Sequence, residues 1–147
     1  MNFPDLGEET QIASAPFVRA VGWLTLREPF PTGSLPPRVT ARLNGFAQSW
    51  TDSVDALGWP VAAGAHCCDL CGRFHASGNF GVPGGELLYV CPEMVAHYVT
   101  HHGYRPPEAF VDALLACPIP GTPAYAEAVT PFRLHFERLN SAPDPRG

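Results

Sequence analysis

The Cys68-Asp-Leu-Cys71 turn, which is followed by a glycine, constrains the fold of this chain more than any other feature. In a zinc knuckle, two thiolates at this spacing bind one ion while backbone amides point at the sulfurs. Two short apolar runs come next, and then a predicted helix that carries His97, His101 and His102. Zinc binds four nitrogen or sulfur ligands in a tetrahedron, and paired histidines three to five residues apart are typical of such sites. The order of these elements predicts a small fold stapled by one zinc ion.

Helix geometry gives two answers for the second histidine ligand. His102 falls near the centre of an apolar face, whereas His97 and His101 lie on its flank; the face comprises Met94, Val95, Tyr98 and Val99. Ideal helical spacing instead favours His97 with His101, because residues i and i+4 share a face. Gly103 decides for His102, since a last turn that tightens before a glycine cap brings an i+5 residue round. The predicted ligands of Zn²⁺ are therefore Cys68, Cys71, His97 and His102, with His101 as the alternative.

The chain has five cysteines, an odd number, and Cys67 and Cys68 are adjacent, so a complete disulfide framework does not follow. In a reducing compartment, clustered thiols indicate a metal site or catalysis. A redox role for Cys68 and Cys71 requires a helix directly after the motif, whereas a glycine and a hairpin follow here. The plain alternative is that these thiols pack as small hydrophobic groups. Cys91, at a predicted helix start, is a second candidate to replace one histidine, and Cys117 is assigned to the core.

The pattern along the chain predicts an α+β fold, a small zinc-stapled domain with the knuckle, a β-hairpin and a helix at its centre. β-branched and aromatic residues at 17–26 indicate a strand, and apolar residues recur at helical spacing over 39–50. Gly84-Gly85 predicts the turn of a hairpin, because that turn needs positive φ at both central positions. Three more helical segments are predicted: one from Pro92 to Gly103, one over 107–117, and one from 122 onward that is bent or broken at Pro131.

At 147 residues with 46% hydrophobic residues, the chain has the size and composition of one domain with one core. We expect a single domain over 1–147, with flexible termini at 1–14 and 141–147. No apolar run approaches the ~20 residues that a membrane-spanning helix needs. The first residues lack the basic and apolar segments of a secretory signal, so a cytoplasmic protein is expected.

The segment VPGGELLYVCPEMVAHYVTHHGYRPPEAF resembles a group of small uncharacterised bacterial proteins. Their pattern is a CxxC zinc knuckle, then VP, then YVxP, HY and HGYxPP, and the resemblance covers about residues 60 to 125. In proteins of this kind the second histidine directly precedes Gly-Tyr, which is His102 in this chain. The resemblance supports His102 as a ligand and implies no named activity.

Three classes of function compete for such a sequence. A closed Cys2His2 zinc site is usually structural, which favours a non-catalytic protein-interaction or regulatory module, including an immunity-type protein. A zinc-finger-like nucleic-acid-binding protein is disfavoured by the net charge of −5, because affinity for nucleic acid comes mainly from cations that neutralise phosphates. A zinc-dependent hydrolase requires an open position for water on the ion, and the sequence has no HExxH and no nucleophile elbow. We therefore expect another protein as the partner, and the sequence does not specify an oligomeric state.

Overall fold

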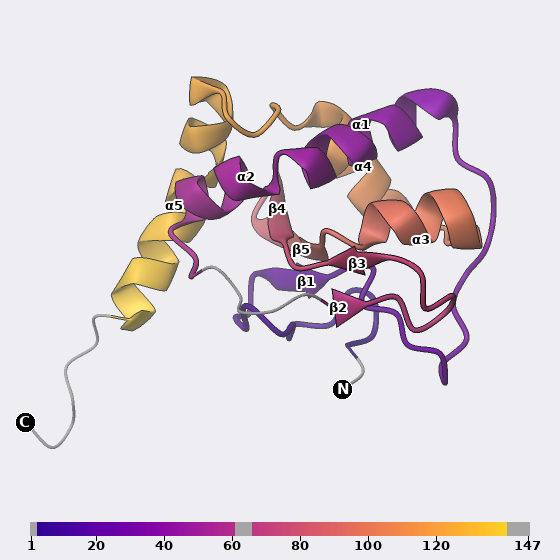
Figure 1. The fold of residues 1–147 in the computed structure, drawn as a ribbon. Coiled ribbons are helices and arrows are strands. Elements are labelled where there is room, and N and C mark those ends of the chain that lie inside the picture. The colour runs from indigo at the N-terminus through magenta and orange to yellow at the C-terminus, as the bar shows by residue number, and fades with distance from the viewer. Residues whose placement is uncertain (1–2, 61–65, 141–147) are drawn as a thin grey trace, which may run out of the picture.

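A computed structural model describes residues 3–60 and 66–140. These ranges contain five helices, a mixed three-stranded sheet and a separate two-stranded hairpin, an α+β fold as predicted (Figure 1). The strands are β1 (Val18–Ala20), β2 (His66–Cys67), β3 (His75–Ala76), β4 (Asn79–Gly84) and β5 (Leu87–Pro92). The helices are α1 (Pro37–Gln48), α2 (Trp50–Leu57), α3 (Val95–His102), α4 (Glu108–Ala116) and α5 (Pro123–Asn140).

The three-stranded sheet has the order β1-β5-β4, in which β5 pairs parallel with β1 and antiparallel with β4. The predicted hairpin is the β4–β5 pair, but its turn lies one residue later than expected. Gly84 pairs with Leu87, so Gly85 and Glu86 form the two-residue loop. Gly85 has φ +62°, a conformation that glycine adopts at no steric cost. The turn therefore uses one glycine of the pair, and the other ends β4.

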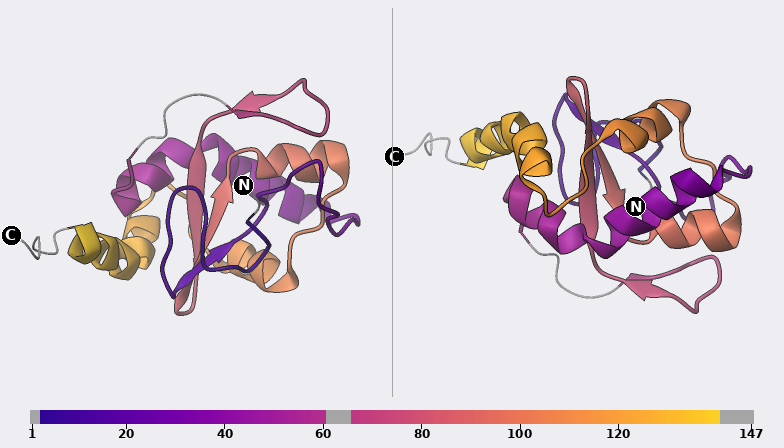
Figure 2. Two further views of the ribbon diagram at one scale, coloured as in Figure 1. Left: turned by 90° about the horizontal axis from the view of Figure 1, so that it is seen from below. Right: turned by 90° about the horizontal axis from the view of Figure 1, so that it is seen from above.

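Helices α1, α2 and α4 pack against β4, and α5 packs against α2. The view from above in Figure 2 shows α1 and α2 crossing the strands, and the view from below shows the N-terminal segment crossing the other side of the sheet. The core between the helices and the sheet is aromatic and aliphatic, and Phe46 of α1 lies 5.9 Å from Phe80 of β4 between ring centroids. Burial of such side chains is the main favourable contribution to folding.

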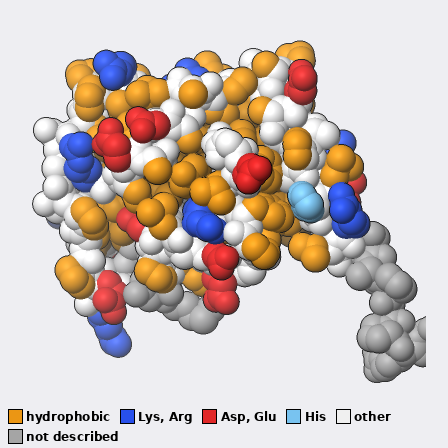
Figure 3. Space-filling model, turned by 180° about the vertical axis from the view of Figure 1, so that it is seen from behind, with side chains coloured by type: hydrophobic (Ala, Val, Ile, Leu, Met, Phe, Trp, Pro, Cys, Tyr) orange, Lys and Arg blue, Asp and Glu red, His pale blue; other side chains and the backbone are white. Residues whose placement is uncertain are grey.

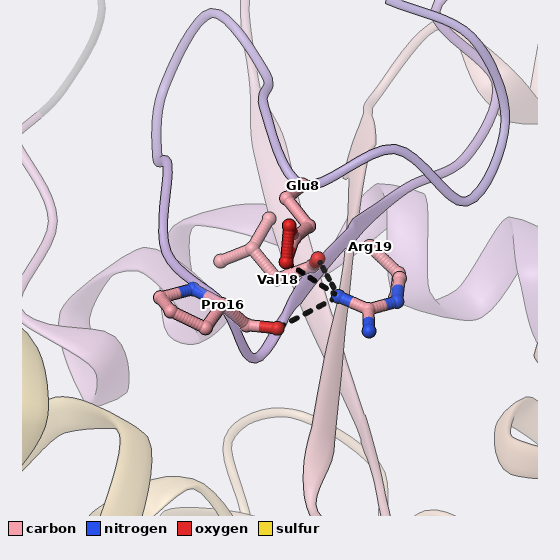
Figure 4. Close-up of polar contacts among 4 residues, drawn as sticks. All are labelled: Glu8, Pro16, Val18 and Arg19. Atoms are coloured by element: carbon pink, nitrogen blue, oxygen red, sulfur yellow. Dashed lines mark hydrogen bonds and ion pairs between the residues drawn. The ribbon is translucent and has the colours of Figure 1, made fainter.

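The described part of the N-terminal segment is hydrogen bonded to β1. Leu6 donates its backbone N–H to Ala20, and Ala20 donates to Gly7. Arg19 donates from Nη1 to the carbonyls of Pro16 and Val18 and lies 3.9 Å from a Glu8 carboxylate oxygen (Figure 4). Residues 141–147, the predicted flexible tail, lie outside the described residues. The single-domain organisation stays a prediction.

Three elements begin or end elsewhere than the sequence predicts. The strand expected over 17–26 is limited to Val18–Ala20, because Gly22 has φ +81° and donates its N–H to Asp5 instead of to a neighbouring strand. Pro92 ends β5 and does not open a helix, so α3 begins at Val95. Helix α5 runs through Pro131 without a break. None of the helices within 3–60 and 66–140 is long and apolar enough to cross a membrane.

Candidate metal centre

The Cys68–Cys71 turn forms the end of the small β2–β3 hairpin. Cys68 donates its backbone N–H to Phe74, and Gly72 donates to the carbonyl of Cys68. Gly72 has φ +66°, which turns the chain back toward β3. The side chain of Cys68 is fully buried and that of Cys71 is partly buried. The local hydrogen bonds thus point both thiols inward from an otherwise exposed hairpin.

The two histidines come from α3, which packs against α1. His97 is buried and His102, the last residue of the helix, is partly buried. Gly103 follows with φ +66° as the predicted C-cap, and Tyr104 donates its N–H back to Tyr98. This left-handed cap ends the helix immediately after His102. It therefore leaves both imidazoles directed at the knuckle although they are five residues apart.

The four side chains form one cluster, in which all the ligand atoms lie within 4.8 Å of one another. Cys68 Sγ is 3.5 Å from His102 Nε2, Cys71 Sγ is 3.4 Å from His97 Nε2, and the two Nε2 atoms are 3.2 Å apart. A tetrahedral zinc ion with bonds of about 2.3 Å to sulfur and 2.05 Å to nitrogen requires S···N edges of about 3.6 Å and an N···N edge of about 3.3 Å. These three distances match those edges to within a few tenths of an ångström, and the other pairs lie within 4.8 Å. The cluster is therefore close to the dimensions of a tetrahedral S2N2 metal site.

Local electrostatics favour metal-binding protonation states of the histidine. Burial lowers the pKa of His97, and the neighbouring His101 and His102 lower it further, so its neutral imidazole is favoured. Burial raises the pKa of the Cys68 thiol, and the backbone N–H groups of Cys71 and Leu70 act in the opposite direction. A cation among these groups would favour the thiolate, because an opposite charge stabilises the ionised form. His97 is thus favoured as a neutral imidazole, whereas ionisation of the Cys68 thiol would be favoured only once a cation binds.

The two alternative ligands lie outside the cluster. His101 is exposed and accepts or donates a 2.9 Å hydrogen bond through Nδ1 to Thr100, while its ring stacks on His97 at 4.6 Å. Cys91 lies in β5, fully buried in the apolar core, and burial raises its pKa well above that of a free thiol. Cys117 is also buried, as expected of a core residue. That Cys68, Cys71, His97 and His102 bind an ion stays a prediction, although the structure brings all four together.

Phe74 is part of the site and was missed by sequence reasoning. Its ring stacks on His97 with a centroid distance of 4.4 Å and an interplanar angle of 5°. The buried Nδ1 of His97 has no hydrogen-bond partner among the described residues. Metal-binding histidines are usually oriented by a hydrogen bond at the second nitrogen, whereas here Phe74 and His101 hold the ring between them. In the sequence, the position of Phe74 three residues after Cys71 was the one feature that could have indicated this role.

Comparisons with known proteins identify a family without assigning a role. A family model described as a domain of unknown function, DUF7919, matches residues 1–115. This range includes the knuckle, both histidines, the three-stranded sheet and nearly all of α4. No curated protein and no solved structure matches the chain.

Proposed function

This chain belongs to the DUF7919 family, and we propose that it is a non-catalytic protein-interaction or regulatory module in which Cys68, Cys71, His97 and His102 bind one structural zinc ion. The observation that carries the proposal is the cluster itself. Its S···N and N···N distances are close to the edges of a zinc tetrahedron. The role of the ion is to join the β2–β3 hairpin to α3.

Zinc is the ion that best fits this donor set. Tetrahedral sites with two sulfurs and two nitrogens are typical of zinc, whereas magnesium and calcium prefer oxygen ligands. The cluster contains no carboxylate among the residues that the structure describes. Four protein ligands also complete the tetrahedron, so they leave no position for the activated water that a zinc hydrolase uses. The donor set thus supports a structural role over a catalytic one.

The surface and charge of the chain support a protein partner. The net charge of −5 disfavours a phosphate backbone as the target. Several large apolar side chains are exposed, and these are Leu6, Leu26, Phe74, Ile119, Leu134 and Leu139. Figure 3 shows hydrophobic side chains gathered in the middle of the face opposite to that in Figure 1, with charged groups scattered among them. Single exposed apolar side chains are normal on any protein, but a gathered patch such as that in Figure 3 is typical of surfaces that bind other proteins.

Metal analysis of the purified protein tests the zinc site directly. We expect about one zinc per chain, and Cys71→Ser should lose it, because one thiolate cannot replace the pair. Cys117→Ser is the matched control, since its thiol lies outside the cluster. Purified protein that holds no metal and still has an ordered β2–β3 hairpin would contradict the proposal.

Cobalt substitution tests whether the site is closed. Co²⁺ in an S2N2 tetrahedron gives an intense visible absorption that reports directly on its ligands. Azide or cyanide should leave this spectrum unchanged, because the four protein ligands fill the coordination sphere. A spectrum that shifts on anion addition indicates an open position and would favour a hydrolase.

Binding assays then separate a protein partner from nucleic acid. The wild-type chain and Cys71→Ser are used as baits in parallel, because a partner that recognises the zinc-dependent fold should be retained by the first alone. A screen with general hydrolase substrates should give no turnover. Salt-sensitive binding to DNA, without a protein retained on the wild-type bait, would contradict the proposed role.

A further inference from the structure

A cleft of about 380 Å³ lies beside the metal cluster and contains none of the four cluster residues. One wall comes from the N-terminal half of the chain, with Phe3 and Trp23. The opposite side comes from the knuckle and the strand after it, with Asp69 and Asn79, and Tyr98 of α3 completes the lining. This volume is in the range of small-molecule sites.

Two largely buried polar side chains in this cleft have no hydrogen-bond partner among the described residues. Asn79 is 7% exposed and Tyr98 is 7% exposed. Neither the carboxamide of Asn79 nor the hydroxyl of Tyr98 makes a hydrogen bond within the part of the chain that the structure describes. Among the described residues, the polar atoms that are both fully enclosed and unpaired belong to Trp59, His97 and Arg133, and not to Asn79 or Tyr98. Both groups therefore keep their access to solvent where they line the cleft.

In the free protein these groups are satisfied by solvent, because their polar atoms stay accessible. A ligand that covered them without pairing them would leave them unsatisfied, at a cost of about 1–3 kcal/mol. In the core, by contrast, the hydroxyls of Ser53 and Tyr125 bond to each other at 2.7 Å, and Tyr125 also donates to Gly81. Asn79 and Tyr98 are therefore free to pair with a ligand, and they favour one that carries matching hydrogen-bonding groups.

Two aromatic side chains give one wall of the cleft an apolar surface. The rings of Phe3 and Trp23 meet edge to face with centroids 5.8 Å apart. Trp23 donates its indole N–H to the carbonyl of Val90 at 2.9 Å, which fixes the orientation of the ring. An indole held in this way is a preformed surface for stacking, because no rotamer freedom is lost on binding.

The charges of the cleft exclude one class of ligand. Among the described residues, no lysine or arginine lines it, and Asp69 is its one carboxylate. With a divalent ion bound, the ion and the two thiolates of Cys68 and Cys71 sum to zero charge, so Asp69 determines the charge of the lining. A carboxylate or phosphate in the cleft would meet repulsion and no cation. An uncharged ligand is not repelled by Asp69 and needs no cation to neutralise it.

From these observations we infer that the cleft binds a small, uncharged, planar heteroaromatic molecule with an amide-type edge. Its ring packs on Trp23 and Phe3. Its adjacent donor and acceptor pair with the carboxamide of Asn79, which presents the same two groups side by side, and the Tyr98 hydroxyl makes a third hydrogen bond. This inference goes beyond the proposed role of the metal, because it concerns residues outside the cluster.

The test is a titration of the purified, metal-containing protein with nicotinamide and adenine, followed by Trp fluorescence and ligand-observed NMR. Nicotinate, which has the same ring with a carboxylate in place of the amide, is the matched probe for charge. We expect nicotinamide or adenine to bind with at least about tenfold higher affinity than nicotinate, equal to about 1.4 kcal/mol. Absence of binding by both neutral probes, or equal binding of nicotinate, overturns the inference.

Two variants separate binding from folding. Asn79→Leu and Tyr98→Phe should each weaken binding of the neutral probe about tenfold, because each removes one hydrogen-bonding group. Neither should lower Tm, since neither polar group is hydrogen bonded to another described residue. Tyr89→Phe is the matched control, because Tyr89 is equally buried but lies outside the cleft. Metal content is measured for every variant. Unchanged affinity in Tyr98→Phe, or a fall in Tm with no change in affinity, overturns the inference.

Discussion

Two hairpins follow one another in this chain, and they are held in place by different means. The β4–β5 hairpin pairs six residues of each strand and is largely buried under α1, α2 and α4. The β2–β3 hairpin pairs two residues of each strand, and His66, Cys67 and His75 are exposed. A short two-stranded hairpin is marginal in water by itself. The β4–β5 hairpin is therefore stabilised by the core, whereas in the role that we propose the β2–β3 hairpin depends on the Cys2His2 cluster.

The two hairpins therefore differ in the source of their stability. Apolar burial can stabilise the sheet without any ligand. Few apolar side chains of the β2–β3 hairpin are available for the same purpose, although Cys68 and Ala76 reach the core. In the role that we propose, a metal ion replaces the missing hydrophobic contacts, and it does so through α3, which is itself packed on α1. Four experiments can break or sharpen this comparison.

Metal removal should have the largest effect, and it should be local. Structural zinc contributes an apparent ~10–16 kcal/mol in small zinc peptides. After treatment with a strong chelator, hydrogen exchange should show loss of protection over residues 66–76 while β4 and β5 stay protected. Alkylation should then modify Cys68 and Cys71, while the core thiols Cys91 and Cys117 stay unmodified. Simultaneous loss of protection in both hairpins would show that the metal supports the whole fold.

Removal of one histidine ligand should have the next largest effect. His102→Ala should weaken zinc binding more than about 100-fold, because changes even to groups that orient a ligand cost 10–100-fold. His101→Ala is the matched control, since the exposed His101 bonds to Thr100 and lies outside the cluster. Competition with a zinc indicator measures both affinities. The reverse order of zinc loss would mean that the end of α3 is arranged differently when the ion is bound.

A cavity in the sheet should have a smaller but global effect. Leu88 is fully buried in β5, so Leu88→Ala should lower the free energy of unfolding by about 2–5 kcal/mol. Both hairpins should lose that stability in chemical denaturation of the metal-bound protein, because the cluster is anchored through α3 to the same core. Leu139→Ala, at an exposed position on α5, should change stability by less than about 0.5 kcal/mol. An effect of Leu88→Ala confined to β4 and β5 would show that the two hairpins unfold independently.

The smallest expected effect is the alkaline titration of a core thiol. Burial raises the pKa of Cys117 from 9.0 to about 11. The folded state then holds its proton while the unfolded state releases it, so the free energy of unfolding falls as pH rises from 9 to 11, by an amount on the order of 1 kcal/mol. The contribution of the protonated Cys117 thiol to the free energy of unfolding is fully present below pH 9. Cys117→Ala should make this slope shallower, measured by denaturation across that range, because the buried Cys91 also keeps its proton and contributes the remainder. An unchanged slope would mean that Cys117 does not contribute.

Several parts of the fold and the site could be predicted from the sequence because they depend on neighbouring residues. The CxxC spacing, the Gly84-Gly85 turn and the Gly103 cap depend on a few adjacent residues, and each has a strong conformational preference. The β4–β5 hairpin and the end of α3 lie within one residue of the predicted positions. The choice of His102 over His101 also came from local helix geometry, and the structure brings His102 to the two thiols.

Tertiary contacts decided what the local pattern could not. Phe17 to Leu26 favours a long strand, but the pairing available on β5 and the Gly22–Asp5 hydrogen bond limit β1 to three residues. Pro92 favours a helix start, yet it completes β5, because Glu93 is tied to Gly78 by two hydrogen bonds. Phe74 was assigned no role, although it stacks on His97. In each case the deciding partner lies at least fifteen residues away in the chain.

The sequence by itself determined that this chain has two thiols and two imidazoles at a spacing that suits one ion. The tertiary structure decided their mutual distances, excluded His101 and Cys91 from the cluster, and placed Asn79 and Tyr98 in one cleft. The physical reason is one of range. Backbone preferences act over a few residues and can be read from neighbouring positions in the sequence. The distance between Cys71 and His97 instead depends on how a hairpin and a helix pack on a common core.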